Sequence, residues 1–456
     1  MILWKYIKDK LLEHPNQLVC EGNAKMTYEE LCVFAENHGK NLKAHYNGIL
    51  CGSEMATAMA LLACFAAEKI AVPMPTRYGK EHYMKILDTL EPTCVITDSD
   101  GEISEIYIDS QETRSNLADT SAVILFTSGS TGAPKGVMLS EENLIANVRD
   151  IKTYMPIGKD DTVLITRPLY HSSVLTGEFL TAIWSGAKIV FSSEAFQPLN
   201  ILNLIKSNGV TFFGTTPTLA ATLSRFIRKE NELPLRILSI SGECITEGVA
   251  RTIRAAFPKV DIFTGYGLSE ASPRVAYLPP EMFDSHPVAA GFPVPSVSLR
   301  IVDAQDRDLP LGEEGELLVQ GPNVMDGYFK DPLKSRKILR HGWLHTGDIA
   351  YVREDGLLYI KGRKDDMIIR AGMNIYPAEI ENALSTDNRI RAVQVYGYEK
   401  NGTQEIGLIV CGNFLSVDDV MVLCRSKLPS YQLPSKIEIT KQIERMPGGK
   451  RKRKIA

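Results

Sequence analysis

The sequence predicts an α/β fold with a large N-terminal domain of mixed α/β subdomains, a small antiparallel barrel-like patch and a small α+β C-terminal domain. Apolar runs of strand length alternate with helical patterns through most of the chain, which is typical of α/β folds. After Ile301 the runs shorten and alternate, and turn residues gather at Asp303–Asp306 and Glu354–Gly356. The charged stretch Lys361–Asp366 then precedes a second, smaller set of elements.

The elements of the N-terminal part follow from local sequence. Met55–Ala67 is an Ala-rich apolar stretch of thirteen residues, so it predicts a buried helix and is too short to cross a bilayer. Short apolar runs predict buried strands. These runs are Ala122–Phe126, Val163–Ile165, Lys188–Phe191, Arg236–Ile240 and Val260–Phe263.

The elements beyond Lys361–Asp366 predict a separate small domain. Pro377–Leu384 has Pro near the first turn and acidic residues after it, as helix N-termini prefer. Strands are expected at Ala392–Val395 and Ile406–Val410. We therefore expect an N-terminal domain at residues 1–363 and a C-terminal domain at residues 364–456.

Composition indicates an ordinary globular protein. The chain has 456 residues, 44% of them hydrophobic and 23% charged, which suits two or three domains. A net charge of −4 gives no overall field that attracts nucleic acid. The N-terminal stretch lacks the apolar core and cleavage site of a signal peptide. The eight cysteines form no C-x-x-C pair, so we expect small buried thiols and a cytoplasmic protein without a transmembrane segment.

The segment Ser121–Leu139 carries the strongest chemical signal. Its apolar run breaks into Thr127–Gly132, where hydroxyl side chains alternate with glycines, and Lys135 follows. Glycines allow close backbone approach, so N–H groups, hydroxyls and the lysine can surround a triphosphate. The spacing is not that of a Walker A loop, because Lys135 precedes its glycine. A flexible linker is the alternative, but a linker has no reason to follow a buried strand.

Further motifs extend this signal along nearly the whole chain, and together they resemble those of the adenylate-forming enzymes. This superfamily includes acyl-CoA synthetases, adenylation domains of peptide synthetases and luciferases. The matching motifs are Thr127–Val137, Tyr266–Glu270, Gly315–Leu317 with Gly321, Gly327–Tyr328, Trp343–Asp348, Gly362–Asp366 and Pro447–Lys450. The motif Tyr266–Glu270 has the form found in the acyl-CoA-synthetase branch. The chain departs from the pattern between Thr27 and Thr127, where relatives usually have more residues.

The resemblance implies ATP and Mg²⁺ as cofactors and a set of residues that bind them. These are Thr127, Ser128, Gly129, Ser130, Thr131, Gly132, Lys135, Gly265, Tyr266, Gly267, Ser269, Glu270, Asp348, Arg363 and Lys450. Glu270 would be the metal ligand, Tyr266 would stack on adenine, and Asp348 would accept hydrogen bonds from the ribose diol with Arg363 beside it. Each residue also has a structural alternative. Glu270 could be a helix N-terminal carboxylate and Tyr266 a core aromatic, while Asp348 could cap a turn and Arg363 could form a surface ion pair.

The resemblance also implies a mobile C-terminal domain and three catalytic residues, Lys450, His171 and Thr131. Lys450 would reach between the substrate carboxylate and the α-phosphate, although residues 450–454 also read as a solvated basic tail. The small domain would turn about a hinge at Asp365. That rotation would replace Lys450 with Gly372, which would lie against the pantetheine arm.

The substrate site is expected between the segments Arg167–Ser173 and Gly265–Glu270. Its residues would be His171, Ser172, Ser241, Gly242, Gly265 and Gly267. Amino-acid-activating relatives carry an Asp in the first segment to hold the ammonium group. Tyr170–Ser173 contains no carboxylate, so an α-amino acid is disfavoured. An aromatic or medium-chain aliphatic carboxylic acid is expected.

These observations predict an acid–thiol ligase that converts a carboxylic acid to an acyl-AMP and transfers it to coenzyme A, in fatty-acid, aryl-acid or secondary metabolism. A stand-alone adenylation enzyme that loads the phosphopantetheine of an acyl carrier protein is the alternative. A non-catalytic nucleotide-binding protein belongs to another class and would require damaged motifs. A serine hydrolase is disfavoured, since no G-x-S-x-G motif occurs.

Overall fold

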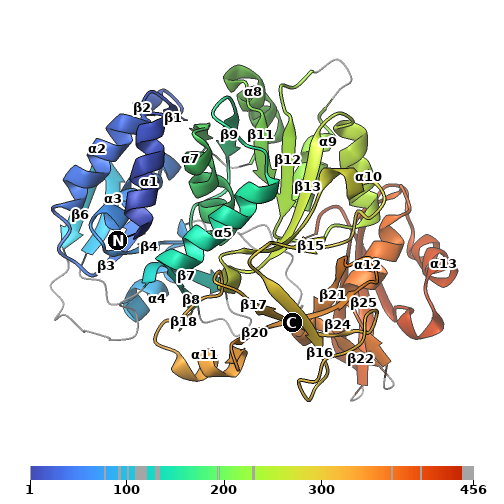
Figure 1. Ribbon diagram of the computed structural model, residues 1–456. Helices are drawn as coiled ribbons and strands as arrows, with labels where there is room; N and C mark the ends of the chain where they lie inside the picture. The colour runs from blue at the N-terminus through green and yellow to red at the C-terminus, as the bar shows by residue number, and fades with distance from the viewer. Residues whose placement is uncertain are drawn as a thin grey trace.

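The computed structural model describes residues 2–76, 79–90, 94–99, 102–107, 121–128, 134–192, 194, 196–227, 232–370, 373–400 and 403–443. The chain forms two large sheets whose strands interleave in sequence, a smaller barrel-like sheet and a C-terminal group of elements (Figure 1). Among the described residues, no helix combines the length and apolar character that crossing a membrane requires.

The larger sheet has nine strands. Their order is β15 (Phe292–Pro293), β14 (Arg274–Leu278), β13 (Asp261–Gly267), β12 (Ile237–Ser241), β11 (Phe212–Thr215), β9 (Thr162–Ile165), β10 (Lys188–Phe191), β1 (Leu18–Glu21) and β2 (Ala24–Thr27). The strands from β13 to β1 are parallel, and β2, β14 and β15 are antiparallel to their neighbours. Parallel strands covered on both faces are continuously apolar, and β12 is buried at every position.

The second sheet has seven strands. Their order is β18 (Gly327–Tyr328), β8 (Pro134–Ser140), β7 (Ser121–Ser128), β4 (Ile70–Pro73), β3 (Tyr46–Leu50), β5 (Cys94–Ser99) and β6 (Glu102–Tyr107). β18 comes from a segment nearly 190 residues after β8 and lies at the edge of the sheet. It thereby brings Tyr328 close to the hairpin of β7 and β8.

Helices cover the two sheets. They are α1 (Ile2–Glu13), α2 (Tyr28–Gly39), α3 (Glu54–Ala66), α4 (Lys80–Leu90), α5 (Glu141–Tyr154), α6 (Ser172–Val174), the π-helix η2 (Leu175–Leu180), α7 (Thr181–Ser185), α8 (Pro198–Asn208), α9 (Pro217–Ser224) and α10 (Glu247–Ala256). Local sequence explains their starts. Thr27 and Glu30 form a capping box at α2, and Ser140 and Asn143 form one at α5.

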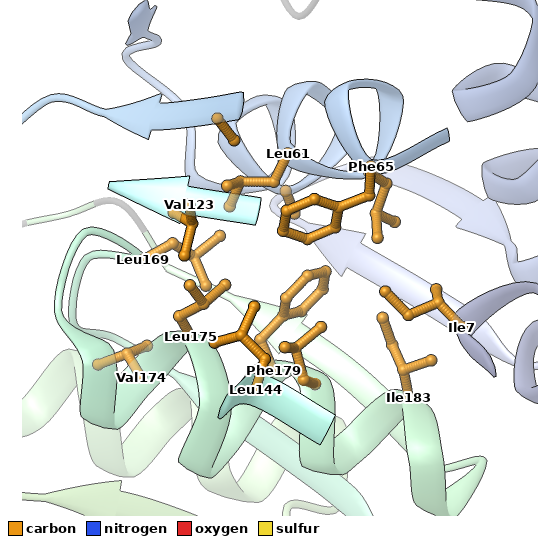
Figure 2. Close-up of a cluster of buried hydrophobic side chains, with 14 of the residues drawn as sticks. Ile7, Leu61, Phe65, Val123, Leu144, Leu169, Val174, Leu175, Phe179 and Ile183 are labelled. Carbon is orange, nitrogen blue, oxygen red and sulfur yellow. The ribbon is translucent and has the colours of Figure 1, made fainter. Parts of the chain in front are cut away.

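The main core lies between the two sheets. Figure 2 shows Leu61 and Phe65 of α3 facing Leu175 and Phe179 of η2, with Val123 of β7 beside them. Phe65 and Phe179 are fully buried. A second apolar cluster fills the opposite face of the larger sheet, under α8, α9 and α10. The packed helices therefore hold the two sheets in a fixed relation to each other.

The barrel-like sheet and the C-terminal elements follow. The former has β16 (Ser298–Val302), β17 (Gly315–Gln320), β20 (Trp343–Val352), β19 (Leu339–Arg340) and β21 (Leu358–Arg363), with α11 (Pro332–Ile338) and the turns η3 (Ser269–Ala271) and η4 (Pro280–Met282) nearby. The latter are η5 (Lys364–Asp366), β22 (Ile368–Arg370), β23 (Met373–Ile375), α12 (Pro377–Ser385), β24 (Ile390–Lys400), β25 (Thr403–Gly412), α13 (Val417–Lys427), η6 (Ser430–Gln432) and β26 (Lys436–Thr440). The C-terminal elements have their own sheets and core.

The C-terminal elements contact the larger domain at α10 and near η5. The Glu247 N–H donates to Asn382 Oδ1 at 2.9 Å, and the Arg251 guanidinium donates to the Thr386 carbonyl at 3.3 Å. Gly248 is required here, because a Cβ at this position would overlap the Ser385 carbonyl. Figure 1 shows α10 and α12 side by side at this contact.

The predicted α/β class is confirmed, and the predicted elements form close to their expected positions. Met55–Ala67 forms most of α3, and Pro377–Leu384 forms α12. The expectation of buried thiols is wrong at one position, because Cys244 is exposed just after β12, whereas the other seven cysteines are buried. The domain boundary between residues 363 and 364 stays a prediction.

Candidate active site

Tyr266, Asp348 and Arg363 form one polar cluster, which we call the adenosine-side cluster. The Tyr266 hydroxyl donates to Asp348 Oδ2 at 2.5 Å, and Arg363 Nη1 donates to Asp348 Oδ1 at 3.2 Å. Asp348 and Arg363 are register partners on β20 and β21, so the sheet itself places them together. Arg363 also donates to the Thr346 carbonyl at 2.8 Å. Three sequence motifs, carried by the three strands β13, β20 and β21, thus meet at the Asp348 carboxylate.

Burial controls the protonation of this cluster. Asp348 is 7% exposed, and burial raises the pKa of its carboxyl above the ordinary value, while the Arg363 charge opposes that rise. Burial and the neighbouring Asp348 raise the pKa of Tyr266 well above its usual range. The proton therefore stays on the phenol. In its ionised form Asp348 would accept hydrogen bonds from a vicinal diol, the role that the resemblance implies for it.

Glu270, Tyr328 and Lys135 form a second cluster, which we call the phosphate-side cluster. The Tyr328 hydroxyl donates to Glu270 Oε1 at 2.7 Å, and Lys135 Nζ lies 5.7 Å from the centre of the Tyr328 ring. The backbone of Glu270 is also fixed, because Met325 N–H donates to its carbonyl at 2.9 Å. Burial and the charge of Lys334 lower the pKa of Lys135, and Glu270 opposes this effect. A carboxylate and an ammonium group are thus held around one tyrosine.

The phosphate-side cluster fits a magnesium ion that is held mainly by phosphate. Glu270 Oε2 has no hydrogen-bond partner among the described residues, so it can coordinate a cation. Within the described part of the chain, no group of three or more His, Cys, Asp or Glu side chains could hold a metal by itself. Mg²⁺ commonly takes one or two carboxylates and completes its shell with phosphate oxygens and water. A single glutamate suits that arrangement.

Thr127, Ser128 and Lys135 of the expected phosphate-binding segment lie among the described residues. Thr127 ends the buried run of β7 and is the register partner of Lys135 on β8. Ser128 belongs to β7 and pairs with Pro134. Several predicted residues lie outside the described residues, so their geometry stays a prediction. They are Gly129, Ser130, Thr131, Gly132, Gly372 and Lys450.

Small residues gather on one face of the larger sheet, where its parallel strands end. Register pairs place Gly214 beside Ser239, and Ser241 beside Gly265. Because side chains alternate along a strand, Tyr266 points to the opposite face of β13. We call the face with these small residues the acid face. Ligands of open α/β sheets bind at such carboxyl ends of strands.

The other residues predicted for the substrate lie around this face. Ser172 at the start of α6 donates through its hydroxyl to Ser269 Oγ of η3 at 3.3 Å. His171 immediately precedes α6, and its ring lies 4.5 Å from that of Tyr170. Gly242 follows β12 with a φ of +94°, a conformation that favours glycine. A Cβ added at Gly267 would overlap the Pro273 carbonyl, so only glycine fits at this position.

Three charged residues at the acid face were missed by the sequence analysis. Arg167 and Glu178 form a buried ion pair, and Arg274 of β14 is 4% exposed. A Cβ on Gly214 would overlap the Glu178 carboxylate, and a Cβ on Gly265 would overlap Arg274 Nη1. Burial raises the pKa of Glu178, and the charges of Arg167 and Arg274 oppose that rise. The available signal was two charged residues inside otherwise apolar elements.

Asp365, the expected hinge, lies in η5 between the barrel-like sheet and the C-terminal elements. It lines a hollow with Ile368, Tyr396 and Gln404. Lys361 and Lys364, on either side of β21's end, pair with Glu314 and Glu316 of the larger domain at 3.1 and 3.0 Å. These ion pairs adjoin the expected hinge. Whether rotation occurs there stays a prediction.

Comparisons with known proteins agree with the geometry. A family model described as AMP-binding enzyme matches residues 8–329. The chain is 32% identical over 338 residues to a feruloyl-CoA synthase of Amycolatopsis sp, covering 73% of this chain and 68% of that protein. It is 33% identical over 342 residues to a long-chain-fatty-acid–CoA ligase of Salmonella typhimurium, covering 73% and 61%.

A solved structure matches almost the whole chain. This is the o-succinylbenzoate coenzyme A synthetase of Bacillus subtilis in complex with ATP and magnesium ion, with 25% identity, a TM-score of 0.83 and 98% of each chain covered. The expected enzyme class, an AMP-forming acid–CoA ligase that uses ATP, Mg²⁺ and coenzyme A, is confirmed at the level of the family. The chain belongs to the AMP-binding enzyme family, in its acyl-CoA synthetase branch.

Proposed function

We propose that this enzyme activates an aromatic or medium-chain aliphatic carboxylic acid, and not an α-amino acid, and transfers its acyl group to coenzyme A. The observation that carries the proposal is the position of β13 between two different environments. Tyr266 points from it to Asp348, and Glu270 follows in η3 beside Tyr328. Gly265 lies on the acid face of the same strand, with the Arg274 guanidinium packed against it. A nucleotide and an acid bound on either side would meet at its carboxyl end.

The first half-reaction follows from this placement. An oxygen of the substrate carboxylate attacks the α-phosphorus of ATP, the bond to the bridging oxygen breaks, and pyrophosphate leaves. Asp348 would accept the ribose hydroxyls, while Tyr266 would stack on adenine. Lys135, Thr127, Ser128, Ser130 and Thr131 would hold the outer phosphates. A Mg²⁺ ion on Glu270 would supply positive charge, and fixed charges of this kind stabilise the transition state.

The second half-reaction requires the acyl-AMP carbonyl to be accessible to a thiol. The sulfur attacks the acyl carbon, the bond to the phosphate oxygen breaks, and AMP leaves with the electron pair while the thiol proton passes to solvent. Lys450 would serve the first step and Gly372 the second, with a rotation near Asp365 between them. Lys450→Ala should therefore abolish acyl-AMP formation but spare thiolysis of supplied acyl-AMP. A bulky residue at Gly372 should do the reverse.

The exclusion of α-amino acids rests on the groups near α6. Tyr170–Ser173 offers no carboxylate for an ammonium group. Glu178, a buried carboxylate on the acid face, is already paired with Arg167. An ammonium-bearing substrate would face an arginine there, and like charges repel at short range. An acid without an amino group is the better fit.

The proposal is tested by acid-dependent release of pyrophosphate from ATP. A panel of amino and non-amino acids is incubated with enzyme, ATP and Mg²⁺, and then with coenzyme A or a phosphopantetheinylated carrier protein. We expect release with non-amino acids and a thioester with free coenzyme A. If the thioester forms only on the carrier protein, the acceptor is the carrier protein and not coenzyme A. Absence of release across the panel, with ATP still bound, would contradict the catalytic proposal.

A further inference from the structure

Arg274 is a buried cation without an ion-pair partner in the described part of the chain. Arg274 is 4% exposed, and its side-chain Nε has no hydrogen-bond partner. The one carboxylate near it, Glu178, is paired with Arg167. Two guanidinium groups therefore share one carboxylate, and the group carries one net positive charge when Glu178 is ionised. A buried charge without full compensation is costly, which points to an anionic ligand.

Two buried asparagines hold the backbone of Arg274. Its N–H donates to Asn147 Oδ1 at 3.1 Å, and its carbonyl accepts from Asn147 and Asn323 at 2.8 and 3.1 Å. Both asparagines are fully buried. The side chain is thus held on β14 at the acid face, although no described acidic group binds its guanidinium there.

Glycines make room for this guanidinium. A Cβ at Gly265 would overlap Arg274 Nη1, and a Cβ at Gly177 would lie 3.5 Å from Nη2. The other titratable group that senses it is Tyr154, whose pKa is raised by burial while the Arg274 charge opposes this. A neutral phenol does not compensate a charge. The guanidinium therefore lies among glycines, a phenol and an already paired carboxylate, at the level of β13 where the acid is expected.

Polar atoms without partners extend this environment. Glu178 Oε2 and Arg167 Nε, which belong to the ion-paired residues at the acid face, are buried and lack a hydrogen-bond partner. Native proteins leave few such atoms unsatisfied, and those that remain call for a ligand or another specific explanation. A purely hydrocarbon tail would cover these groups without pairing them.

We propose that Arg274 binds a second anionic group at the distal end of the acid, so that the preferred substrate is a dicarboxylic acid. The inference rests on the proposed function and narrows it to acids of this kind. One carboxylate reacts at the carboxyl end of β13, and the other pairs with Arg274 on the acid face. The reactive carboxylate is unchanged by this contact. Arg274 is thus a specificity-determining residue.

The experiment compares acids that differ only at the distal end. Straight-chain and aryl dicarboxylic acids are each paired with the half methyl ester and with the monocarboxylic acid of equal length, and kcat/KM is measured from acid-dependent AMP formation. We expect the wild type to prefer the best dicarboxylic acid over its neutral partners by at least about tenfold. Arg274→Leu should lower kcat/KM for the dicarboxylic acid about 100-fold and leave the neutral acids unchanged or improved.

Controls separate recognition from folding. Arg274→Lys keeps the charge and should retain part of the preference, whereas Arg225→Leu removes an exposed arginine and should change nothing. Equal losses for charged and neutral acids in Arg274→Leu would make the residue structural and overturn the inference. If the Arg274 variants fail to fold, the wild-type preference decides, and a wild type that favours neutral acids overturns it as well. If the wild type forms no AMP with any acid of the panel, the result contradicts the proposed function. AMP formation with neutral acids alone contradicts only the role of Arg274, so the two failures can be told apart.

Discussion

At the scale of single residues, Asp348 has conflicting requirements. Its proposed role, to accept hydrogen bonds from a diol, requires the ionised carboxylate, yet its burial favours the protonated form and raises its pKa. Arg363 and the Tyr266 hydroxyl reduce this conflict by pairing with its two oxygens. A residue whose charge is disfavoured by folding but needed for binding is typical of a functional site.

Asp348→Asn should therefore separate activity from stability. A raised folded-state pKa gives a stability contribution that is present at low pH and lost as pH rises through that pKa. At neutral pH the uncharged Asn avoids this loss, so we expect an unchanged or higher melting temperature. We expect kcat/KM for ATP to fall about 100-fold. Thermal unfolding and ATP kinetics check this, with exposed Asp355→Asn as the control. A large fall in melting temperature would contradict the interpretation.

Tyr328 has a positioning role that depends on its hydroxyl. Tyr328→Phe keeps the ring beneath Lys135 but removes the hydrogen bond to Glu270. A hydrogen bond to a charged group is worth about 1.5–3 kcal/mol, so we expect KM for ATP with Mg²⁺ to rise about tenfold. The Mg²⁺ dependence should shift to higher concentration. Tyr359→Phe, which removes a remote hydroxyl near His286, is the matched control. Identical kinetics in both variants would rule out the role.

At the scale of elements, the contact between α10 and α12 joins the larger domain to the C-terminal elements. Gly248 lets the two helices approach, because any side chain there would overlap the Ser385 carbonyl. In a helix Gly→Ala normally stabilises by about 1 kcal/mol, so a harmful effect would report the contact and not the helix. The contact includes polar hydrogen bonds, and interfaces between domains of one chain are typically more polar than obligate interfaces.

Gly248→Ala should disturb this domain contact selectively. We expect one half-reaction, either acyl-AMP formation or thiolysis of supplied acyl-AMP, to fall about tenfold while the other is preserved. The reason is that the added methyl group opposes only the arrangement in which α10 meets α12. Single-turnover assays of each half-reaction measure it. Thr252→Ala on the same helix is the control, and equal losses in both half-reactions would contradict the prediction.

At the scale of the whole molecule, one apolar core fixes the relation between the two sheets. Phe65 of α3 and Phe179 of η2 are fully buried in it (Figure 2). The two clusters of the candidate site are carried largely by different sheets. Lys135 belongs to the seven-stranded sheet, whereas Tyr266 belongs to the nine-stranded sheet. The site geometry therefore depends on this core.

Phe179→Ala should destabilise the protein by about 3–5 kcal/mol, the usual cost of such a truncation in a packed core. Phe226, which is 43% exposed, is the control, and its substitution by Ala should cost less than about 0.5 kcal/mol. Denaturant unfolding followed by circular dichroism measures the difference. We also expect KM for ATP to rise in Phe179→Ala, because the two sheets are no longer held closely. A loss below 1 kcal/mol would show that the core readily repacks.

The sequence predicted the class of the fold. It also singled out Asp348 and Tyr266, which lie 82 residues apart and form a hydrogen bond in the structure. Each belongs to a short motif, and their role toward a nucleotide stays a prediction. The Arg167–Glu178 pair and Arg274 were not predictable in the same way. Their meeting depends on which strands adjoin and on the room left by Gly214 and Gly265. Such tertiary contacts leave only the weak signal of charges within apolar segments.

β18 lies far along the sequence from the other strands of its sheet, and this affects where the chain can be truncated. Residues 327–328 supply the outermost strand of a sheet whose other strands end by residue 140. A fragment that stops after the nine-stranded sheet would leave β8 with bare N–H and C=O groups along its margin. Such margins recruit strands from other molecules and promote aggregation. Truncations intended to yield a tractable catalytic fragment should therefore extend past Tyr328.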